Sequence, residues 1–183
     1  STVLSLGGRL VRQDTSVVLA GPGSSCHLNG LSLASGRQHV DNATFIDHAV
    51  PHCTSHELYK TMLDDEATAG FTGRILVRQD AQKTDAHQSN KTLLLSPKAT
   101  MSTRPQLQIY ADDVKCTHGA AVGQLDDNAV FYLLSRGIDR QTSRALLSYA
   151  FGSEVVEGIP LPAVQAALQS VLRERLGLAP EDF

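Results

Sequence analysis

Residues 105–111 read PQLQIYA, with apolar Leu107, Ile109 and Ala111 at every second position. A period of two is typical of a β-strand that buries one face. Upstream, further short β-type runs are separated by Gly, Pro, Asn and Asp, and they cover residues 9–12, 16–20, 26–33, 73–78 and 92–95. No long helix fits before about Val122, so the sequence predicts a mainly β fold for this part.

The pentapeptide Leu-Val-Arg-Gln-Asp occurs twice, at residues 10–14 and 76–80, so that the two copies are 66 positions apart. Three stacked coils of about 22 residues would explain this spacing, which indicates a β-solenoid. Solenoid repeats usually contain more than one matching pair, so the alternative is two similar strands of a β-sandwich. The residues alone leave both architectures open.

The apolar period changes after Gly123, where helical patterns begin. Asp126 or Asp127 can cap a first helix that stops at Gly137. Asp139 can cap a second helix that runs to Gly152. The last third of the chain is therefore predicted to be helical.

A third helix is expected to begin at Pro160 or Pro162, since proline suits the first helical turn, and to end at Gly177. Its apolar residues recur at helical spacing and form one stripe, made of Val164, Leu168, Val171 and Leu172. Such a stripe most often packs on its own domain. Binding of a partner protein is the alternative.

Composition excludes several classes of protein. The 183 residues suit a single domain, and no apolar run approaches the roughly 20 residues that a membrane span needs, so we expect a soluble protein with no membrane partner. The net charge is −3 and the 16 Lys and Arg are scattered, which argues against a nucleic-acid partner. The first residues follow a strand-and-turn pattern without a signal peptide, and we expect the chain to begin within the fold.

Three cysteines, Cys26, Cys53 and Cys116, are widely spaced and include no C-x-x-C pair. This spacing predicts reduced cytosolic thiols rather than a disulfide framework or a tetrathiolate metal site. In an extended strand Cys116 and His118 lie on one face, about 6.6 Å apart at Cα, close enough to share one metal ion or cluster iron. Two ligands do not complete a site, so the others would come from elsewhere. The alternative is a small core cysteine beside a hydrogen-bonded buried histidine.

Other clusters are weaker candidates for a site. His48, His52 and His56 have helical spacing, but Pro51 interrupts a helix there, so we expect hydrogen-bonding side chains rather than a zinc site. The run DDE at residues 64–66 is typical of a solvated turn rather than of an acid–base pair. The Gly-rich residues 21–26 lack the Gly-Lys-Ser/Thr of a phosphate-binding loop, so the chain itself is not expected to bind a nucleotide.

Three segments together resemble the SufB/SufD family of the Suf iron–sulfur cluster assembly system. The first is HAVPHCTS at residues 48–55, with YK at 59–60 and FTGRI at 71–75. The second is AQKTDAHQSN at 81–90, followed by LLLSP at 93–97. The third and most specific is ADDVKCTHGA at 111–120, with VG at 122–123, LD at 125–126, FY at 131–132 and SRGI at 135–138.

The resemblance implies a right-handed parallel β-helix core over residues 1–123, truncated at its N-terminal side, followed by a C-terminal α-helical region over residues 124–183. It implies a non-catalytic scaffold subunit that pairs with SufB through the β-helix and docks the SufC ATPase through the helices. A transient iron–sulfur cluster is then expected at the interface with SufB. The location implied is the cytoplasm of a bacterium or a plastid-like equivalent.

The family's Cys-Ser/Thr-His-Gly stretch corresponds to residues 116–119 here. The resemblance therefore implies that His118, with Cys116 beside it, takes part in cluster assembly at the interface and binds metal transiently. SufB-like sequences have a functional cysteine where this chain has Leu133, and a glutamate where it has Pro162. Both departures indicate the SufD branch of the family.

Two rival interpretations remain at this stage. One is a β-helix enzyme that acts on acidic polysaccharide, although the strand segments contain no cluster of carboxylates or basic residues that such an enzyme needs. The other is a purely structural β-solenoid in which Cys116 and His118 belong to the core. An exposed coil end can also pair edge to edge, so the isolated chain is expected to be able to form a homodimer.

Overall fold

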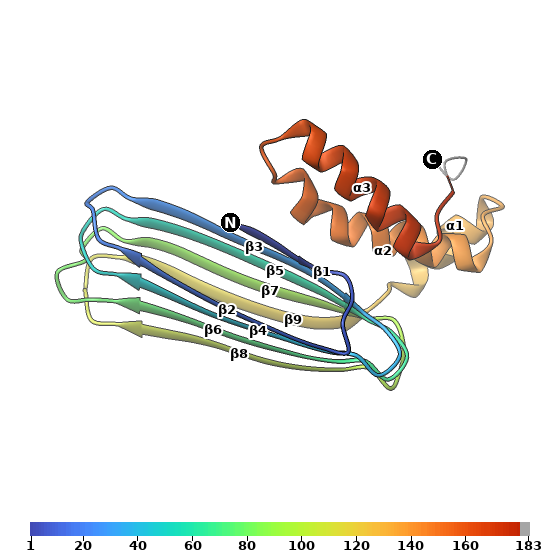
Figure 1. Ribbon diagram of the computed structural model, residues 1–183, viewed down its shortest axis with the longest axis horizontal. Coiled ribbons are helices and arrows are strands. Elements are labelled where there is room, and N and C mark those ends of the chain that lie inside the picture. Colours follow the sequence, from blue (N-terminus) through green and yellow to red (C-terminus); the bar gives the residue numbers. More distant parts are fainter. Residues whose placement is uncertain (180–183) are drawn as a thin grey trace.

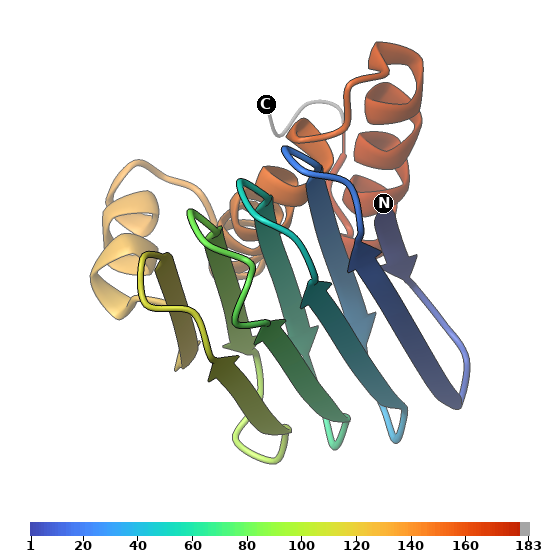
Figure 2. The same ribbon diagram turned by 90° about the vertical axis from the view of Figure 1, so that its left-hand side faces the viewer.

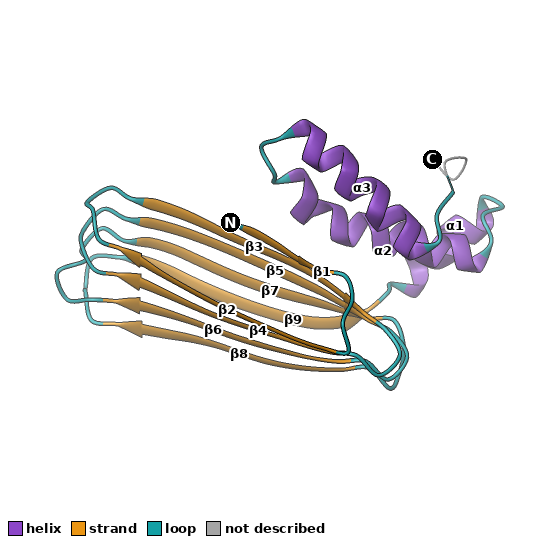
Figure 3. Ribbon diagram, in the orientation of Figure 1, coloured by secondary structure: helices purple, strands orange, loops and turns teal. Residues whose placement is uncertain are grey.

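A computed structural model describes residues 1–179, which form nine strands and then three helices (Figures 1 and 3). The strands are β1 (Thr2–Ser5), β2 (Leu10–Leu19), β3 (Ser25–Ala34), β4 (His39–His48), β5 (Thr54–Leu63), β6 (Thr68–Val77), β7 (Asp85–Leu94), β8 (Thr100–Ile109) and β9 (Lys115–Gln124). The helices are α1 (Asp127–Ser135), α2 (Arg140–Glu157) and α3 (Pro162–Leu176). The last four residues of the helical region expected over residues 124–183 lie outside the described part of the chain.

The strands form two parallel sheets that face each other across one core. One sheet has the order β1-β3-β5-β7-β9 and the other β2-β4-β6-β8, so the chain passes from one sheet to the other at every turn. Each full coil adds one strand to each sheet, and the coils stack side by side (Figure 2). The predicted parallel β-helix followed by C-terminal helices is confirmed.

The coil length of about 22 residues that the pentapeptide repeat suggested is wrong. Thr2 pairs with Asn29 and Thr68 pairs with Thr100, so a coil takes 27 to 32 residues. Leu10 opens β2, whereas Leu76 is near the end of β6 and stacks two coils away from Val18. The two copies therefore occupy different places in their coils, and their similarity is coincidental.

The strands are longer and more numerous than the short runs predicted from the sequence. The sequence did not indicate β4 and β5 as strands because their inward faces are rich in polar residues. Asn42, Thr44, His48 and Glu57 are all buried between the sheets. β8 runs through Pro105, which lacks a donor for a ladder hydrogen bond. This is tolerated because, among residues 1–179, β8 is the last strand of its sheet and pairs with β6 alone.

The helix ends follow the predicted capping residues, with one exception. Asp126 and Asp139 cap α1 and α2 with their side chains, and Gly177 ends α3 in the left-handed conformation at φ 72°. α2, however, continues past Gly152 to Glu157. Gly152 does not end the helix; it lies against Met62 of β5 and Leu172 of α3, where a larger side chain would meet both.

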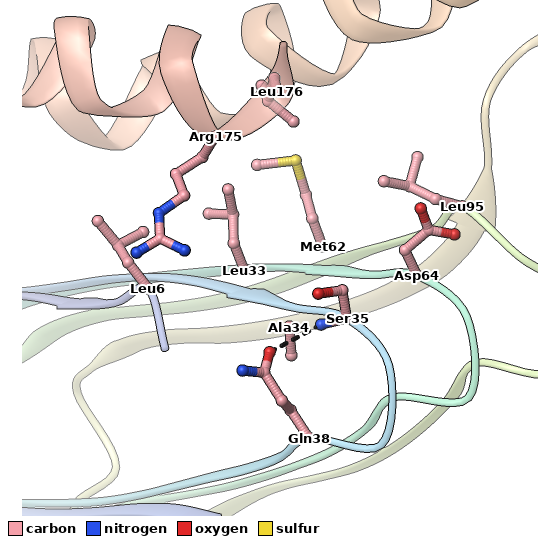
Figure 4. A pocket seen from close by; sticks show the side chains of 10 residues that line it. All are labelled: Leu6, Leu33, Ala34, Ser35, Gln38, Met62, Asp64, Leu95, Arg175 and Leu176. Atoms are coloured by element: carbon pink, nitrogen blue, oxygen red, sulfur yellow. Dashed lines mark hydrogen bonds between the residues drawn. The ribbon is translucent and has the colours of Figure 1, made fainter. Parts of the chain in front are cut away.

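α2 and α3 cover the outer face of the five-stranded sheet and form a second apolar layer there. Leu31, Met62 and Leu93 of the sheet pack against Val155 and Leu172 of the helices. Beside this layer a pocket lies between α3 and the sheet, lined in part by Leu33, Met62 and Leu95, with Arg175 extending over it (Figure 4). Within residues 1–179 no helix is both long and apolar enough to span a bilayer.

Candidate functional site

Cys116 and His118 lie on the same inward face of β9, the last strand of the five-stranded sheet. Cys116 pairs with Ala86 of β7 and His118 pairs with Gln88, and both β7 residues are buried between the sheets. No further coil follows β9 within the described residues, so this rung forms the open end of the solenoid. Both candidate residues thus stand at one end of the core.

Cys116 is half-buried and packs against the main apolar cluster of the solenoid. Burial raises the pKa of its thiol above the ordinary value, and the negative charge of Asp85 raises this pKa further. The thiol is therefore protonated at neutral pH, and it becomes a good ligand only when a metal ion displaces its proton.

His118 is exposed because no residue of the described range 1–179 covers it on the inward face of the last rung. Beneath it, one rung deeper, lies Gln88, and beneath Gln88 lies Glu57 of β5. Gln88 and Glu57 are each 3% exposed, and the amide Nε2 of Gln88 donates a 2.6 Å hydrogen bond to Oε2 of Glu57. His118 is therefore the outermost member of a polar column that runs into the core.

Glu57 is an unusual residue for the interior of a β-solenoid. Burial raises the pKa of its carboxyl group, and the nearby Thr44 hydroxyl and the hydrogen-bonded Gln88 amide offset part of that shift. The nearby thiol of Cys26 and the phenol of Tyr59 have raised pKa values, in each case chiefly through burial and further through the charge of Glu57. The interior next to the column is thus polar but poorly solvated.

The other histidines do not join His118. Nε2 of His48 is buried and lies 2.9 Å from the Ser55 hydroxyl, and His52 lies in the turn before β5 with φ 62°. His56 is on the outer face of β5, where its ring stacks between His27 and His87, with 5.2 Å between ring centroids on each side. The structure thus places His48, His52 and His56 apart from one another, as expected from the interruption at Pro51.

Among residues 1–179, no group of three or more His, Cys, Asp or Glu side chains is arranged to hold a metal ion. Cys116 and His118 would therefore supply only part of a ligand set. The acidic run at residues 64–66 lies in the turn between β5 and β6, where Asp65 accepts a hydrogen bond from the Gly36 amide and Glu66 pairs with Lys98. These carboxylates hold the solenoid corner and do not face one another across a cleft.

Residues 1–151 match the family model described as "SUF system FeS cluster assembly, SufBD core domain". The chain belongs to the SufBD core domain family. It is 40% identical over 171 residues to the iron–sulfur cluster assembly protein SufD of Escherichia coli. The matched region covers 93% of this chain and 40% of that protein. The printed description of this domain family assigns it to iron–sulfur cluster assembly by the SUF system.

Relatives in other organisms agree with this assignment. The chain is 39% identical over 160 residues to the chloroplastic protein ABCI7 of Arabidopsis thaliana, covering 86% of this chain and 33% of that protein. It is 31% identical over 158 residues to SufD of Bacillus subtilis, covering 86% of this chain and 36% of that protein. The predicted resemblance to the SufD side of the family is confirmed, and the chain spans about two fifths or less of the length of these SufBD relatives.

Sequence reasoning missed Gln88 and Glu57. Both are polar residues in runs of mixed polarity, and neither is close to His118 in the sequence. Their alignment under His118 depends on strand pairings between residues about 30 positions apart. Without the coil length, no local pattern could have revealed this column.

Proposed function

We propose that this protein is a non-catalytic scaffold subunit for iron–sulfur cluster assembly. It pairs with SufB through the open end of the solenoid and binds the SufC ATPase through its C-terminal helices. His118 and Cys116 contribute ligands to a transient cluster at the SufB interface, with the cluster as cargo rather than as a resident cofactor. The observation that carries this proposal is the exposure of inward-facing His118 on an unpaired terminal rung.

The open end has the properties of a protein interface. In the described part of the chain β8 and β9 each pair with a neighbour on one side only, so their free edges offer backbone hydrogen-bonding groups to another chain. Large apolar side chains are exposed on and after these strands, including Tyr110 at 67% and Val122 at 45%. Exposed apolar groups gathered at one edge favour a protein partner there.

The helices suit a second partner. Two residues separate α1 from β9, and α1 lies near the β9 end of the stack (Figure 2); its Phe131 and Tyr132 are 71% and 56% exposed. On α3, Val164 is 40% exposed although Leu172 in the same apolar stripe is buried. Because so short a connection leaves no room for a flexible linker, a pull on α1 by a SufC dimer would reach β9 directly.

The same proposal covers location and nucleotide binding. The relatives of this protein come from bacteria and from a plant chloroplast, so we assign the protein to the bacterial cytoplasm or to a plastid-like compartment. ATP is bound by SufC in this scheme and not by this chain. Nothing in the described residues favours the polysaccharide-enzyme alternative, because the acidic run at 64–66 is engaged within a solenoid corner.

The test uses the full-length protein purified with SufB and SufC. His118→Ala is compared with His27→Ala, which removes an exposed histidine from the outer face of β3, three strands away from β9 in the sheet. Iron content after cluster assembly and co-elution of SufC in size-exclusion chromatography with light scattering, with and without ATP, are both measured. We expect His118→Ala to lower cluster iron severalfold with SufC still bound, and His27→Ala to match the unchanged protein.

Other outcomes decide against parts of the proposal. Loss of SufC co-elution in the His118→Ala protein would make His118 structural. Equal cluster iron in all three proteins would favour a purely structural solenoid. Failure of the unchanged protein to co-elute with SufC, or its elution only as a homodimer, would contradict the docking of SufC on the helices.

A further inference from the structure

The polar column under His118 contains an acceptor that has no donor. Oε1 of Gln88 is buried and makes no hydrogen bond, whereas Nε2 of the same amide donates to Glu57. Because a carboxylate only accepts hydrogen bonds, the Gln88 amide must turn its nitrogen to Glu57 and its oxygen elsewhere. A buried carbonyl oxygen without a partner is costly, so this oxygen calls for a donor nearby.

The register of the sheet supplies one candidate donor. In the ladder of inward side chains, Gln88 has Glu57 on one side and His118 on the other. Adjacent rungs are about 4.8 Å apart, a spacing that places the end of one polar side chain within reach of the next. The imidazole N–H of His118 can therefore meet the free oxygen of Gln88.

We propose that Gln88 is a positioning residue for His118. When the exposed imidazole of His118 turns toward the core, one of its ring N–H groups donates a hydrogen bond to Oε1 of Gln88, and Glu57 holds the amide in the orientation that makes this possible. This inference rests on the proposed function of His118 as a cluster ligand. It adds two residues, Gln88 and Glu57, that act on the cluster only through His118.

The opposite sheet is shaped to accommodate this arrangement. Gly73 of β6 faces Gln88 across the core, and a Cβ atom at Gly73 would lie 2.3 Å from Nε2 of Gln88. Glycine at this position therefore leaves the space that the amide occupies. A side chain at residue 73 would displace the amide and break its contact with Glu57.

The chemical consequence concerns the tautomer of His118. A neutral imidazole has one ring nitrogen that carries a proton and one that has a free lone pair. The hydrogen bond that the N–H donates decides which of the two nitrogens carries the proton. With its N–H donated inward to Gln88, His118 keeps its other nitrogen unprotonated and available to iron. Histidine ligands are commonly oriented by a hydrogen bond of this kind, and its loss lowers affinity or activity about 10- to 100-fold.

The first test observes His118 without any cluster. The full-length protein is labelled with ¹⁵N-histidine and studied by NMR at about pH 8, where an ordinary imidazole is neutral. The His118 signals are identified by their loss in His118→Ala. We expect one protonated and one unprotonated ring nitrogen in the unchanged protein, and averaged shifts for both in Gln88→Met, which keeps the size of the side chain but removes the acceptor.

Asn90→Leu is the matched control. Asn90 is another buried amide on β7, 1% exposed, but it pairs with Ala120 and so has no imidazole beside it. This variant should leave the His118 shifts unchanged. Unaltered His118 shifts in Gln88→Met, or the same change in Asn90→Leu as in Gln88→Met, would overturn the inference.

The second test measures the rate of cluster formation in the complex with SufB and SufC. Gln88→Met should lower the rate about tenfold, and it should cause no further loss in the His118→Ala background. An equal loss in both backgrounds would mean that Gln88 acts through folding, and the inference would be wrong. If the NMR shifts change as expected but His118→Ala forms clusters normally, the positioning holds and the proposed role of His118 fails.

Discussion

Nζ of Lys60 in β5 donates a 2.7 Å hydrogen bond to the backbone carbonyl of Phe151 in α2. The lysine is only 3% exposed, its ammonium group lies 4.4 Å from the centroid of the Phe151 ring, and it also pairs with Glu154. A charged group that is buried this far must keep its partners. This contact therefore fixes α2 to the solenoid at one defined position.

Replacing Lys60 by Met should lower the free energy of unfolding by about 2 kcal/mol, the size of a hydrogen bond that involves a charged group. Urea unfolding followed by circular dichroism measures this change. The control is Lys91→Met, because Lys91 reaches the same Glu154 at 3.7 Å from a side chain that is 44% exposed. Its loss should cost less than about 1 kcal/mol, and an equal cost for both variants would contradict the importance of burial at Lys60.

Gly152→Leu should loosen the helices from the sheet. A Cβ atom at residue 152 would already lie 3.0 Å from Cε of Met62 and 3.2 Å from Leu172, so a full leucine overpacks the layer by about 2 kcal/mol. Hydrogen exchange of the α2 and α3 amides should become faster. Ala150→Leu, at an exposed position of the same helix, should leave exchange unchanged. Similar effects of the two changes would show that a larger side chain anywhere on α2, and not close packing at residue 152, was responsible.

Gly73→Ala should destabilise the solenoid by about 1–3 kcal/mol, because the added methyl group meets both Nε2 of Gln88 at 2.3 Å and Cε1 of Phe71 at 2.8 Å. Gly119→Ala on the last strand meets nothing within 4 Å and should change stability by less than about 0.5 kcal/mol. Thermal unfolding of the two variants makes the comparison. If Gly73→Ala left the stability unchanged, the amide of Gln88 would be able to adopt another position.

Glu57→Gln should alter the pH dependence of stability. Burial raises the pKa of Glu57 in the folded protein, so the native state binds its proton more tightly than the unfolded state. The free energy of unfolding is therefore highest below the ordinary carboxyl pKa and falls as the pH rises toward the raised native value. Tyr59, whose pKa is raised to about 12, and the Cys26 thiol, whose pKa is also raised, stay neutral in this window.

Glutamine at residue 57 cannot ionise but still accepts a hydrogen bond from Gln88. The free energy of unfolding of the variant should therefore not fall with rising pH, and at neutral pH it should exceed that of the unchanged protein. Urea unfolding at a series of pH values measures both effects. Glu66→Gln is the control, since Glu66 lies in an exposed corner paired with Lys98. A decline that persists in Glu57→Gln would assign it to another group.

Local sequence patterns predicted the features that depend on neighbouring residues. The alternation at 105–109, the capping residues Asp126 and Asp139, and the stop at Gly177 were read correctly, because strand period and helix capping involve residues a few positions apart. Residues 110 and 111, which were expected to continue the strand, lie beyond the end of β8. The same period of two put Cys116 and His118 on one face. The prediction that Gly152 ends a helix was wrong. A glycine is needed there because the backbone of α2 packs closely against β5 and α3.

The sequence by itself determined that a β-rich part precedes three helices, and its motifs identified the SufBD family. Only the tertiary structure decided the coil length, and with it which residues stack on one another. Gln88 lies under His118, and Lys60 holds Phe151 across 91 positions, because parallel strand pairing and helix docking join distant residues. Those contacts depend on how the whole chain closes into coils, and no short stretch of sequence contains that information.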